Sequence, residues 1–386
     1  MRRVSSECSA EAKIMNQRVL ITGGAGFIGA HVANELLSHG YKVRALDSLV
    51  PQVHGPAKVR PAYLSEEVEL VVGDIRDSEA VFCALKNVDA VIHLVSLVGV
   101  GQSMYQIDEY TSVNNFGTAR LLQELTKQPV SKLIVASSMS IYGEGLYVDE
   151  SGAPALPEER TLEQLKLGDW EVRSATGSTL IPAPTPESKQ PSLASVYALS
   201  KFDQERMCLM VGRAYRIPAV ALRFFNTYGP YQALSNPYTG VLSNFAARVL
   251  NGKSPLIFED GRQKRDFVSV YDVARACRLA LEKPEADGHA INISSGVPMT
   301  VAEVASRTIR SLGRPDIDPD ITGKYRMGDI RHCFADVSLA KKLLGWEPVV
   351  TLEQGLQDLA GWLTGQTAID HGVEARSELA ARGLMV

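Results

Sequence analysis

Residues 17–29 read QRVLITGGAGFIG, an apolar run that passes directly into closely spaced glycines. A short apolar run of this kind predicts a buried strand, and the glycines predict a tight turn at its end. The next residues, AHVANELLSHG at 30–40, carry apolar side chains at helical spacing and close on a glycine that is typical of a helix end. This stretch therefore predicts a strand, a turn and a helix in direct succession.

The same alternation continues along the chain. Further strands are predicted at 41–47, 68–75, 89–96 and 132–138, and a long helix at 195–215. Strands that alternate with helices at this spacing predict βαβ units and a doubly wound parallel sheet with both faces covered. We therefore expect an α/β fold with a Rossmann-type domain, which binds its ligands at the carboxyl ends of the strands.

The glycines of the turn have separate tasks. Gly23 allows the tight turn, Gly26 lets the backbone approach a pyrophosphate, and Gly29 lets the helix pack closely on the strand. Asp47 follows about 20 residues after the turn, at the end of the second predicted strand, where a carboxylate binds ribose hydroxyls. An acid at this position also repels a 2′-phosphate, so the pattern predicts NAD in preference to NADP.

Four neighbouring residues complete the predicted cofactor site. Phe27 and Ile28 lie in the glycine turn itself, where the pyrophosphate meets the positive end of the helix dipole. Asp74 and Ile75 end the next predicted strand and are placed to flank the adenine. For Asp74, a simple cap at the strand end is the alternative interpretation.

A second group of residues predicts acid/base chemistry. Tyr197 and Lys201 are four residues apart on the predicted helix, so both side chains point to one side of it. A phenol has a pKa near 10, and a neighbouring ammonium together with the positive nicotinamide ring would favour the phenolate. Ser138 ends a predicted strand, where its hydroxyl could bind the same substrate oxygen. The three residues predict proton transfer coupled to hydride transfer.

Composition and charge limit the class of partner. The 386 residues carry a formal net charge of −4, which offers no electrostatic case for nucleic acid or an anionic membrane. No apolar run approaches the roughly 20 residues of a membrane-spanning helix. The five cysteines are spread along the chain without a CxxC pair, which favours reduced thiols and a cytoplasmic location. No metal site is expected, because no zinc-type spacing of His and Cys is present.

Changes in residue composition and in the regularity of the predicted elements suggest the domain organisation. The segment 145–194 ends in IPAPTPESKQP and is expected to be a surface insertion without strands, either a lid near the substrate or a passive loop. The elements beyond 226 are shorter and less regular, as expected of an α+β substrate domain. The predicted parts are a disordered leader (1–14), a Rossmann domain with this insertion (15–225), a mainly substrate-binding part (226–365) from which 266–285 returns to the Rossmann domain, and a tail (366–386).

These motifs together resemble the extended short-chain dehydrogenase/reductases, and within them the nucleotide-sugar epimerases typified by UDP-glucose 4-epimerase. The resemblance extends over about 17–365 and rests on motifs in family order, including TGGAGFIG, SSMSIYG, YALSK, RFFNTYGP, GRQKRDFVSVYDVA and LGWEP. It implies that Ser138 and Tyr197 are catalytic, with Tyr197 as the general acid/base. It also implies that Lys201 binds the nicotinamide ribose and lowers the pKa of the tyrosine.

The resemblance further implies the ligands of a sugar nucleotide. Asn226 and Arg265 would contact its diphosphate, whereas Arg326 and Asp329 would hold its phosphate and nucleoside ribose. The implied reaction is a closed redox cycle in which the sugar C4 is oxidised, the keto-sugar turns over, and hydride returns to the other face. Family members commonly dimerise, so a homodimer is expected.

Two departures narrow the expected reaction. Sugar-nucleotide 4,6-dehydratases carry an acidic pair directly after the catalytic hydroxyl, and this chain has Met139 and Ser140 there. The long insertion resembles that of epimerases acting on deoxythymidine-diphosphate L-rhamnose, although Ser174 and Gly177 stand where some of those proteins carry a cysteine pair. A nucleotide-sugar reductase, dehydrogenase or decarboxylase is the alternative on the same site, and a non-catalytic NAD-binding scaffold is disfavoured because the tyrosine and lysine are both present.

Overall fold

A central parallel sheet organises the protein. The computed structural model describes residues 16–234, 236, 238, 240–325, 329–366, 377–378 and 381–382. The predicted leader at 1–14, most of the predicted tail and Arg326 lie outside the described residues. The central sheet has seven strands in the order β13-β9-β5-β4-β1-β2-β3, and every neighbouring pair is parallel. The strands are β1 (Arg18–Thr22), β2 (Lys42–Asp47), β3 (Glu69–Val72), β4 (Ala90–His93), β5 (Lys132–Ser138), β9 (Ala219–Phe224) and β13 (Ala290–Ile293).

The connections run outward from β1 in both directions. The order in which strands are added to the sheet therefore reverses between β1 and β4. In open α/β sheets, the ligand crevice lies at this point of reversal, outside the carboxyl ends of the strands. The glycine turn follows β1 directly, and Ser138 is the last residue of β5. The predicted α/β fold with a doubly wound sheet is confirmed.

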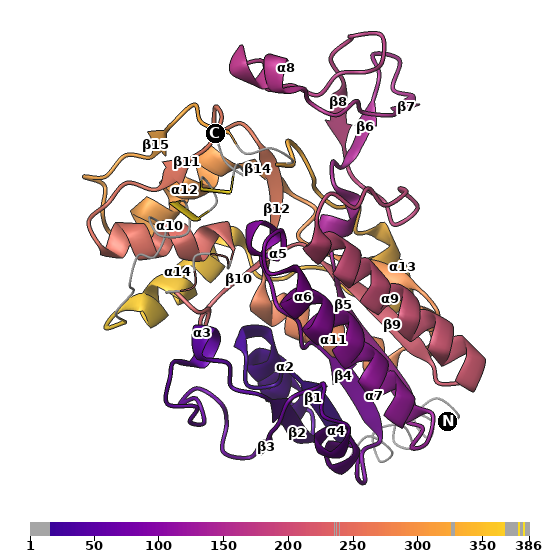
Figure 1. Cartoon of the computed structure of the whole chain (residues 1–386). Coiled ribbons are helices and arrows are strands. Elements are labelled where there is room, and N and C mark those ends of the chain that lie inside the picture. Colours follow the sequence, from indigo (N-terminus) through magenta and orange to yellow (C-terminus); the bar gives the residue numbers. More distant parts are fainter. Residues whose placement is uncertain are drawn as a thin grey trace, which may run out of the picture.

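Helices cover both faces of this sheet (Figure 1). On one face, α2 (Phe27–Ser38) and α11 (Val270–Glu282) enclose an apolar core with the strands. On the other face, a second core packs under α4 (Ser78–Ala84), α7 (Gly117–Leu125) and α9 (Val196–Tyr215). Because both faces are buried, the strands are continuous apolar runs rather than alternating ones.

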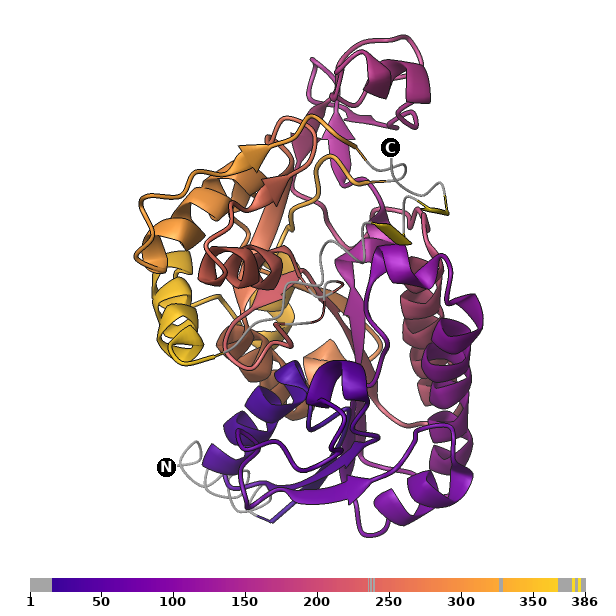
Figure 2. The same cartoon turned by 60° about the vertical axis from the view of Figure 1, so that its left-hand side comes forward.

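The C-terminal part forms a smaller α+β unit beside the sheet (Figure 2). Its core includes Tyr228, Phe267, Val304 and Leu356. The unit is built from α10 (Val241–Leu250), α12 (Val301–Ser311), α14 (Leu352–Leu363), the sheet of β10 (Asn226–Tyr228), β12 (Lys264–Ser269) and β14 (Pro298–Thr300), and the pair β11 (Leu256–Ile257) with β15 (Asp320–Ile321).

More of the C-terminal half returns to the central sheet than the predicted segment 266–285. Strand β13 forms its edge beside β9, and α13 (Ser338–Leu344) and Trp346 belong to the same apolar core as α2. The Trp346 indole donates a hydrogen bond of 3.0 Å to the Asp272 carbonyl of α11. A four-residue strand such as AINI carries too few residues for its periodicity to be recognised.

The expectation that 145–194 contains no strands is wrong. The segment folds into a small antiparallel sheet of β6 (Leu146–Val148), β7 (Pro154–Ala155) and β8 (Ile181–Ala183), with the short helix α8 (Leu162–Lys166). It projects from the molecule in Figure 1 and has its own buried residues Tyr147, Val172 and Leu180. Strands of two or three residues, two of them containing proline, give no readable alternation of polar and apolar positions.

Candidate active site

The turn after β1 needs glycine at specific positions. Gly23 has a φ of +72°, and its N–H donates to the Leu46 carbonyl of β2 at 2.8 Å. A Cβ at Gly29 would lie 2.3 Å from the Gly23 carbonyl oxygen, so a side chain there would separate the helix from the turn. Helix α2 begins with Gly26 as its N-cap and has no side-chain cap. The N–H groups of its first turn are therefore left for another acceptor, as an anion-binding helix end requires.

Asp47 connects this turn to the end of β2. Its carboxylate accepts hydrogen bonds from the N–H groups of Ala25, at 3.1 Å, and Leu49, at 2.9 Å. The side chain of His54 is 3 % exposed and lies 3.6 Å from the same carboxylate. The sequence interpretation did not include His54. Its position just beyond the second strand is the signal that could have identified it. The acid is thus held in place beside the glycine turn.

Asp74 and Ile75 follow β3 nearby. Arg76 forms a two-pronged contact with Asp74, at 2.7 and 3.0 Å, and its hydrogen bonds hold the pKa of that carboxyl below its ordinary value. Ile75 is buried against Gly117, where a Cβ would lie 2.5 Å from the isoleucine side chain. Asp74 is therefore an ion-pair partner, and Arg76 is a further residue of this edge that the sequence interpretation did not single out.

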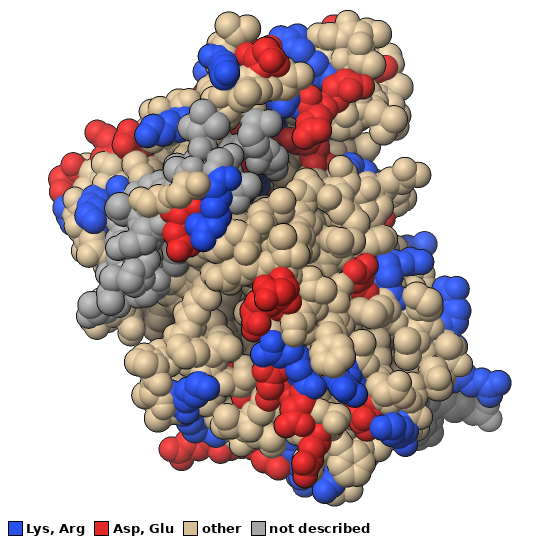
Figure 3. All heavy atoms as spheres, viewed as in Figure 1, with Lys and Arg blue, Asp and Glu red and all other residues tan. Residues whose placement is uncertain are grey.

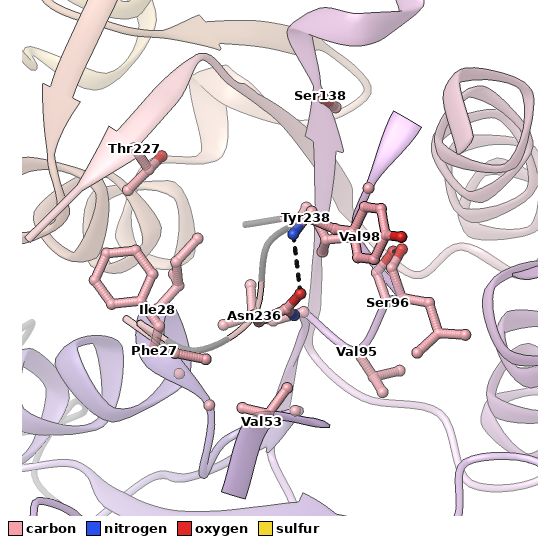
Figure 4. Close-up of a pocket in the computed structure, with 18 of the residues that line it drawn as sticks. Phe27, Ile28, Val53, Val95, Ser96, Val98, Ser138, Thr227, Asn236 and Tyr238 are labelled. Carbon is pink, nitrogen blue, oxygen red and sulfur yellow. Dashed lines mark hydrogen bonds between the residues drawn. The ribbon is translucent and has the colours of Figure 1, made fainter. Parts of the chain in front are cut away.

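One cavity of about 500 Å³ links these residues to the predicted catalytic group. It is lined by the glycine turn with Phe27 and Ile28, by Asp47 with Asp74 and Ile75, and by Ser138, Tyr197, Lys201 and Asn226. Figure 4 shows Phe27 and Ile28 across the cavity from Val95 and Val98, with Ser138 at the end of β5. The residues that follow β4 form a large share of this lining, and their position after a central parallel strand is the signal that could have identified them.

Ser138, Tyr197 and Lys201 come together from two elements. Tyr197 and Lys201 lie one turn apart at the start of α9, which begins with Ser195 as N-cap, its Oγ accepting the Ala198 N–H at 3.1 Å. Ser138 ends β5, and its side chain interacts with the phenol of Tyr197 and lowers the pKa of that phenol. The Lys201 ammonium donates to Gln204 Oε1 at 2.8 Å. The three side chains predicted to act together therefore line a single wall of the cavity.

Burial dominates the protonation of this group. Burial raises the pKa of Tyr197, and the hydrogen bond with Ser138 lowers it. Burial also lowers the pKa of Lys201 from 10.5 to about 7. The expected lowering of the tyrosine pKa by the lysine is therefore not found in the protein alone, because desolvation disfavours both charged forms. The phenolate needs additional positive charge in the cavity.

The predicted substrate ligands are not all brought together. Asn226 lines the cavity, and its side-chain oxygen is buried without a hydrogen-bond partner among the described residues. Arg265 does not line the cavity, because its guanidinium donates to the backbone carbonyls of Lys264, Ile330 and Arg331. Asp329 is also absent from the lining, and its backbone carbonyl accepts from Arg160 at 2.6 Å.

The insertion is fastened to the C-terminal part by a buried ion-pair network. Glu259 contacts Arg160 of the insertion at 2.8 Å and Arg331 at 2.9 Å, and all three side chains are nearly inaccessible to solvent. Glu171 of the insertion contacts Arg331 at 2.6 Å and His332 at 3.2 Å. No residue of 145–194, all of which are described, lines the cavity. The insertion thus holds the segment around 329–332 rather than covering the cavity.

Two other kinds of feature are absent from the described part of the chain. It contains no group of three or more His, Cys, Asp or Glu residues arranged to hold a metal ion. Among the helices in the same described residues, none combines the length and the apolar character needed to cross a membrane.

Known proteins are similar to this chain in sequence and in fold. The model of the NAD dependent epimerase/dehydratase family matches residues 19–166 and 173–294. The dTDP-L-rhamnose 4-epimerase of Burkholderia thailandensis is 34% identical over 351 residues, which are 90% of this chain and 95% of that protein. The UDP-N-acetyl-alpha-D-glucosaminuronate decarboxylase of Bacillus cytotoxicus is 30% identical over 90% of this chain and 98% of its own length.

Solved structures agree with the sequence comparisons. The UDP-glucuronic acid 4-epimerase of Bacillus cereus, in complex with UDP-glucuronic acid and NAD, superposes with a TM-score of 0.74 at 25% identity. The match covers 90% of this chain and 99% of that one. A Rossmann fold with a glycine turn and a Ser/Tyr/Lys wall defines an NAD-binding enzyme of the extended short-chain dehydrogenase/reductase type. The chain belongs to the NAD-dependent epimerase/dehydratase family, and its cofactor is NAD.

Proposed function

We propose that the protein is a nucleotide-sugar 4-epimerase, with deoxythymidine-diphosphate L-rhamnose as the first substrate to test. The observation that carries the proposal is the single cavity lined by the glycine turn, by Asp47, and by Ser138, Tyr197 and Lys201. Similarity to an enzyme named for this reaction supports it. Met139 and Ser140 stand where a dehydratase would need two acids, which argues against that reaction.

The residues at one end of the cavity fit the cofactor. The uncapped start of α2 would bind the pyrophosphate, with Gly23, Gly26 and Gly29 allowing the close approach. Asp47 would bind the adenosine ribose. Phe27, Ile28, Asp74 and Ile75 would line the remainder of the NAD site. Bound NAD supplies a reversible hydride acceptor for the sugar carbon.

The Ser/Tyr wall would handle the proton. Tyr197 would take the proton of the C4 hydroxyl through its phenolate oxygen and return it when C4 is reduced again. Ser138 would donate a hydrogen bond to the same substrate oxygen, and Lys201 would bind the nicotinamide ribose and add positive charge beside the phenol. The unpartnered Asn226 oxygen is available to a donor of the substrate. Arg265, Arg326 and Asp329 remain predicted ligands of the nucleotide diphosphate, and Arg265 would have to exchange its carbonyl partners to act so.

The arrangement of the two parts supports a division of labour. The central sheet would bind NAD, and the C-terminal unit would bind the nucleotide of the substrate, as the location of the cavity between β5 and β10 suggests.

Four described cysteines are free, consistent with a cytoplasmic location.

We also propose a homodimer formed through α7 and α9. Leu199 and Met210 of α9 are 46% and 63% exposed, and Phe116 beside α7 is 46% exposed. The surface over α5 (Val100–Ser103) and the first turns of α9 carries few charges in Figure 3, whereas α6 (Ile107–Tyr110) presents the exposed acids Asp108 and Glu109. Apolar side chains gathered on adjacent helices are typical of an interface.

The decisive experiment tests turnover without added cofactor. Purified protein is incubated with a panel of dTDP-, UDP- and GDP-sugars, and the configuration at C4 is followed by NMR. Sustained inversion at C4 with no added NAD is expected, because the redox cycle is closed. Tyr197→Phe, which removes only the phenol oxygen, should lower turnover by roughly 10²–10⁴-fold. Stoichiometric consumption of NAD, or release of carbon dioxide from a uronic acid sugar, would instead identify a dehydrogenase or the decarboxylase alternative.

A further inference from the structure

Ser140 lies two residues beyond Ser138, on the short 3₁₀ helix Met139–Tyr142 that follows β5. Both side chains are nearly buried and line the cavity. The Ser140 hydroxyl donates to Ser138 Oγ at 2.9 Å, and the Ser140 N–H donates to the same oxygen at 3.2 Å. Ser138 therefore receives two hydrogen bonds from a single residue.

The hydrogen-bonding capacity of a hydroxyl is limited. A serine oxygen has one proton to donate and two lone pairs to accept with. Ser140 occupies both lone pairs of Ser138, so the remaining interaction of Ser138 has to be donation of its own proton. Ser138 can then donate a hydrogen bond to a phenolate or to a substrate oxygen, but it cannot accept a hydrogen bond from a neutral phenol.

This restriction favours one protonation state of the neighbouring tyrosine. Ser138 interacts with Tyr197 and lowers the pKa of its phenol, and a neutral phenol that turned its proton toward Ser138 would meet an oxygen that has no lone pair left. The phenol oxygen can accept a hydrogen bond from Ser138 in either state, but the charged phenolate accepts it more strongly. The titratable groups that face Tyr197 are Tyr110 on α6, with ring centroids 6.5 Å apart, and Lys201 on its own helix.

We propose that Ser140 is a positioning residue that keeps Ser138 as a hydrogen-bond donor, toward Tyr197 in the free cavity or toward the substrate oxygen when a sugar is bound. The inference rests on the proposed function of Ser138 and Tyr197. Ser140 acts through Ser138 and is not itself required to contact the reacting atoms. Ser140 stands at a sequence position where a dehydratase would carry an acid. In this protein, the serine at that position would orient the proton of Ser138.

The test replaces the hydroxyl and follows the tyrosine. In Ser140→Ala, one lone pair of Ser138 becomes free, so the neutral phenol can donate to it and the pKa of Tyr197 should rise by roughly one pH unit. Turnover at neutral pH should fall roughly tenfold, and the acidic limb of its pH profile should move to higher pH by the same interval. Ser140→Thr retains the hydroxyl and should restore the profile.

A spectroscopic titration makes the test independent of the substrate. The ultraviolet difference spectrum of tyrosinate is recorded against pH for the holoenzyme and for Ser140→Ala, and Tyr197→Phe variants of both identify the signal. Ser137→Ala is the matched control, because the Ser137 hydroxyl donates to Glu205 at 2.6 Å and does not bind Ser138. It should leave the midpoint of Tyr197 in place, whatever its effect on stability.

The outcomes separate this inference from the proposed function. An unchanged Tyr197 midpoint in Ser140→Ala, or an equal displacement in Ser137→Ala, would overturn the role of Ser140. If no sugar nucleotide is turned over by the wild-type protein, the proposed function fails, while the tyrosinate titration still decides whether Ser140 controls the phenol.

Discussion

Replacing Lys201 with methionine should stabilise the cofactor-free protein by an amount that decreases as the pH rises. The lysine is 3 % exposed, and burial lowers its pKa from 10.5 to about 7. Between these two pH values the unfolded chain keeps the proton that the folded chain has lost. The free energy of unfolding of the wild-type protein therefore rises with pH in this window, and below about pH 7 the full penalty of burying the charge is present.

The size of the effect follows from the two pKa values. They lie about 3.5 pH units apart, and each pH unit corresponds to about 1.4 kcal/mol, so the penalty has an upper limit of about 5 kcal/mol. At pH 7 it is about 4 kcal/mol, and at pH 9 it has fallen to about 2 kcal/mol. Lys201→Met removes the penalty at every pH, at the cost of the hydrogen bond to Gln204.

The assay is urea unfolding of cofactor-stripped wild-type and variant protein across this pH range. The informative quantity is the change with pH of the stability difference between the two proteins, because costs of the substitution that do not depend on pH, such as altered packing, cancel from it. Lys341→Met removes an exposed ammonium paired with Glu347 and controls for the loss of a lysine. A stability difference that stays constant with pH would refute the reasoning, since it would mean that the buried lysine is not forced to lose its proton.

Two further predictions concern the insertion and the oligomer. Glu259→Gln leaves Arg160 and Arg331 with an incomplete set of buried partners, so the free energy of unfolding in urea should fall by about 3–5 kcal/mol. Glu353→Gln, which breaks an exposed pair with Arg307, should change it by less than about 1 kcal/mol, and equal effects of the two variants would contradict the role of burial. Met210→Glu should shift the protein to monomers in sedimentation velocity, whereas Leu167→Glu on the exposed insertion should not, and a dimer that persists in Met210→Glu would exclude this face.

The glycine turn and the strands around it could be predicted because their signals are local. Gly23, Gly26 and Gly29 occupy positions set by a single strand–turn–helix unit, and Asp47 ends the strand that pairs directly with it. Tyr197 and Lys201 could be assigned as a pair for the same reason, since one turn of a helix brings their side chains to one side. In each case the spacing along the chain already determines the spacing in space.

The remaining features depend on contacts between distant parts of the chain. The Arg265 guanidinium is directed to the carbonyls at 330 and 331 by the packing of the C-terminal segment, and the spacing of the motif contains no information on that contact. The return of β13 to the central sheet was likewise decided by the free edge that β9 offers.

The sequence by itself thus determined the fold class and the cofactor and predicted the acid/base group, because the signal for each lies within one supersecondary unit. Tertiary structure alone decided which side chains line the cavity and how they are charged. Lys201 and Tyr197 are shifted toward neutrality by burial, and burial is a property of everything that surrounds a side chain rather than of its neighbours along the chain.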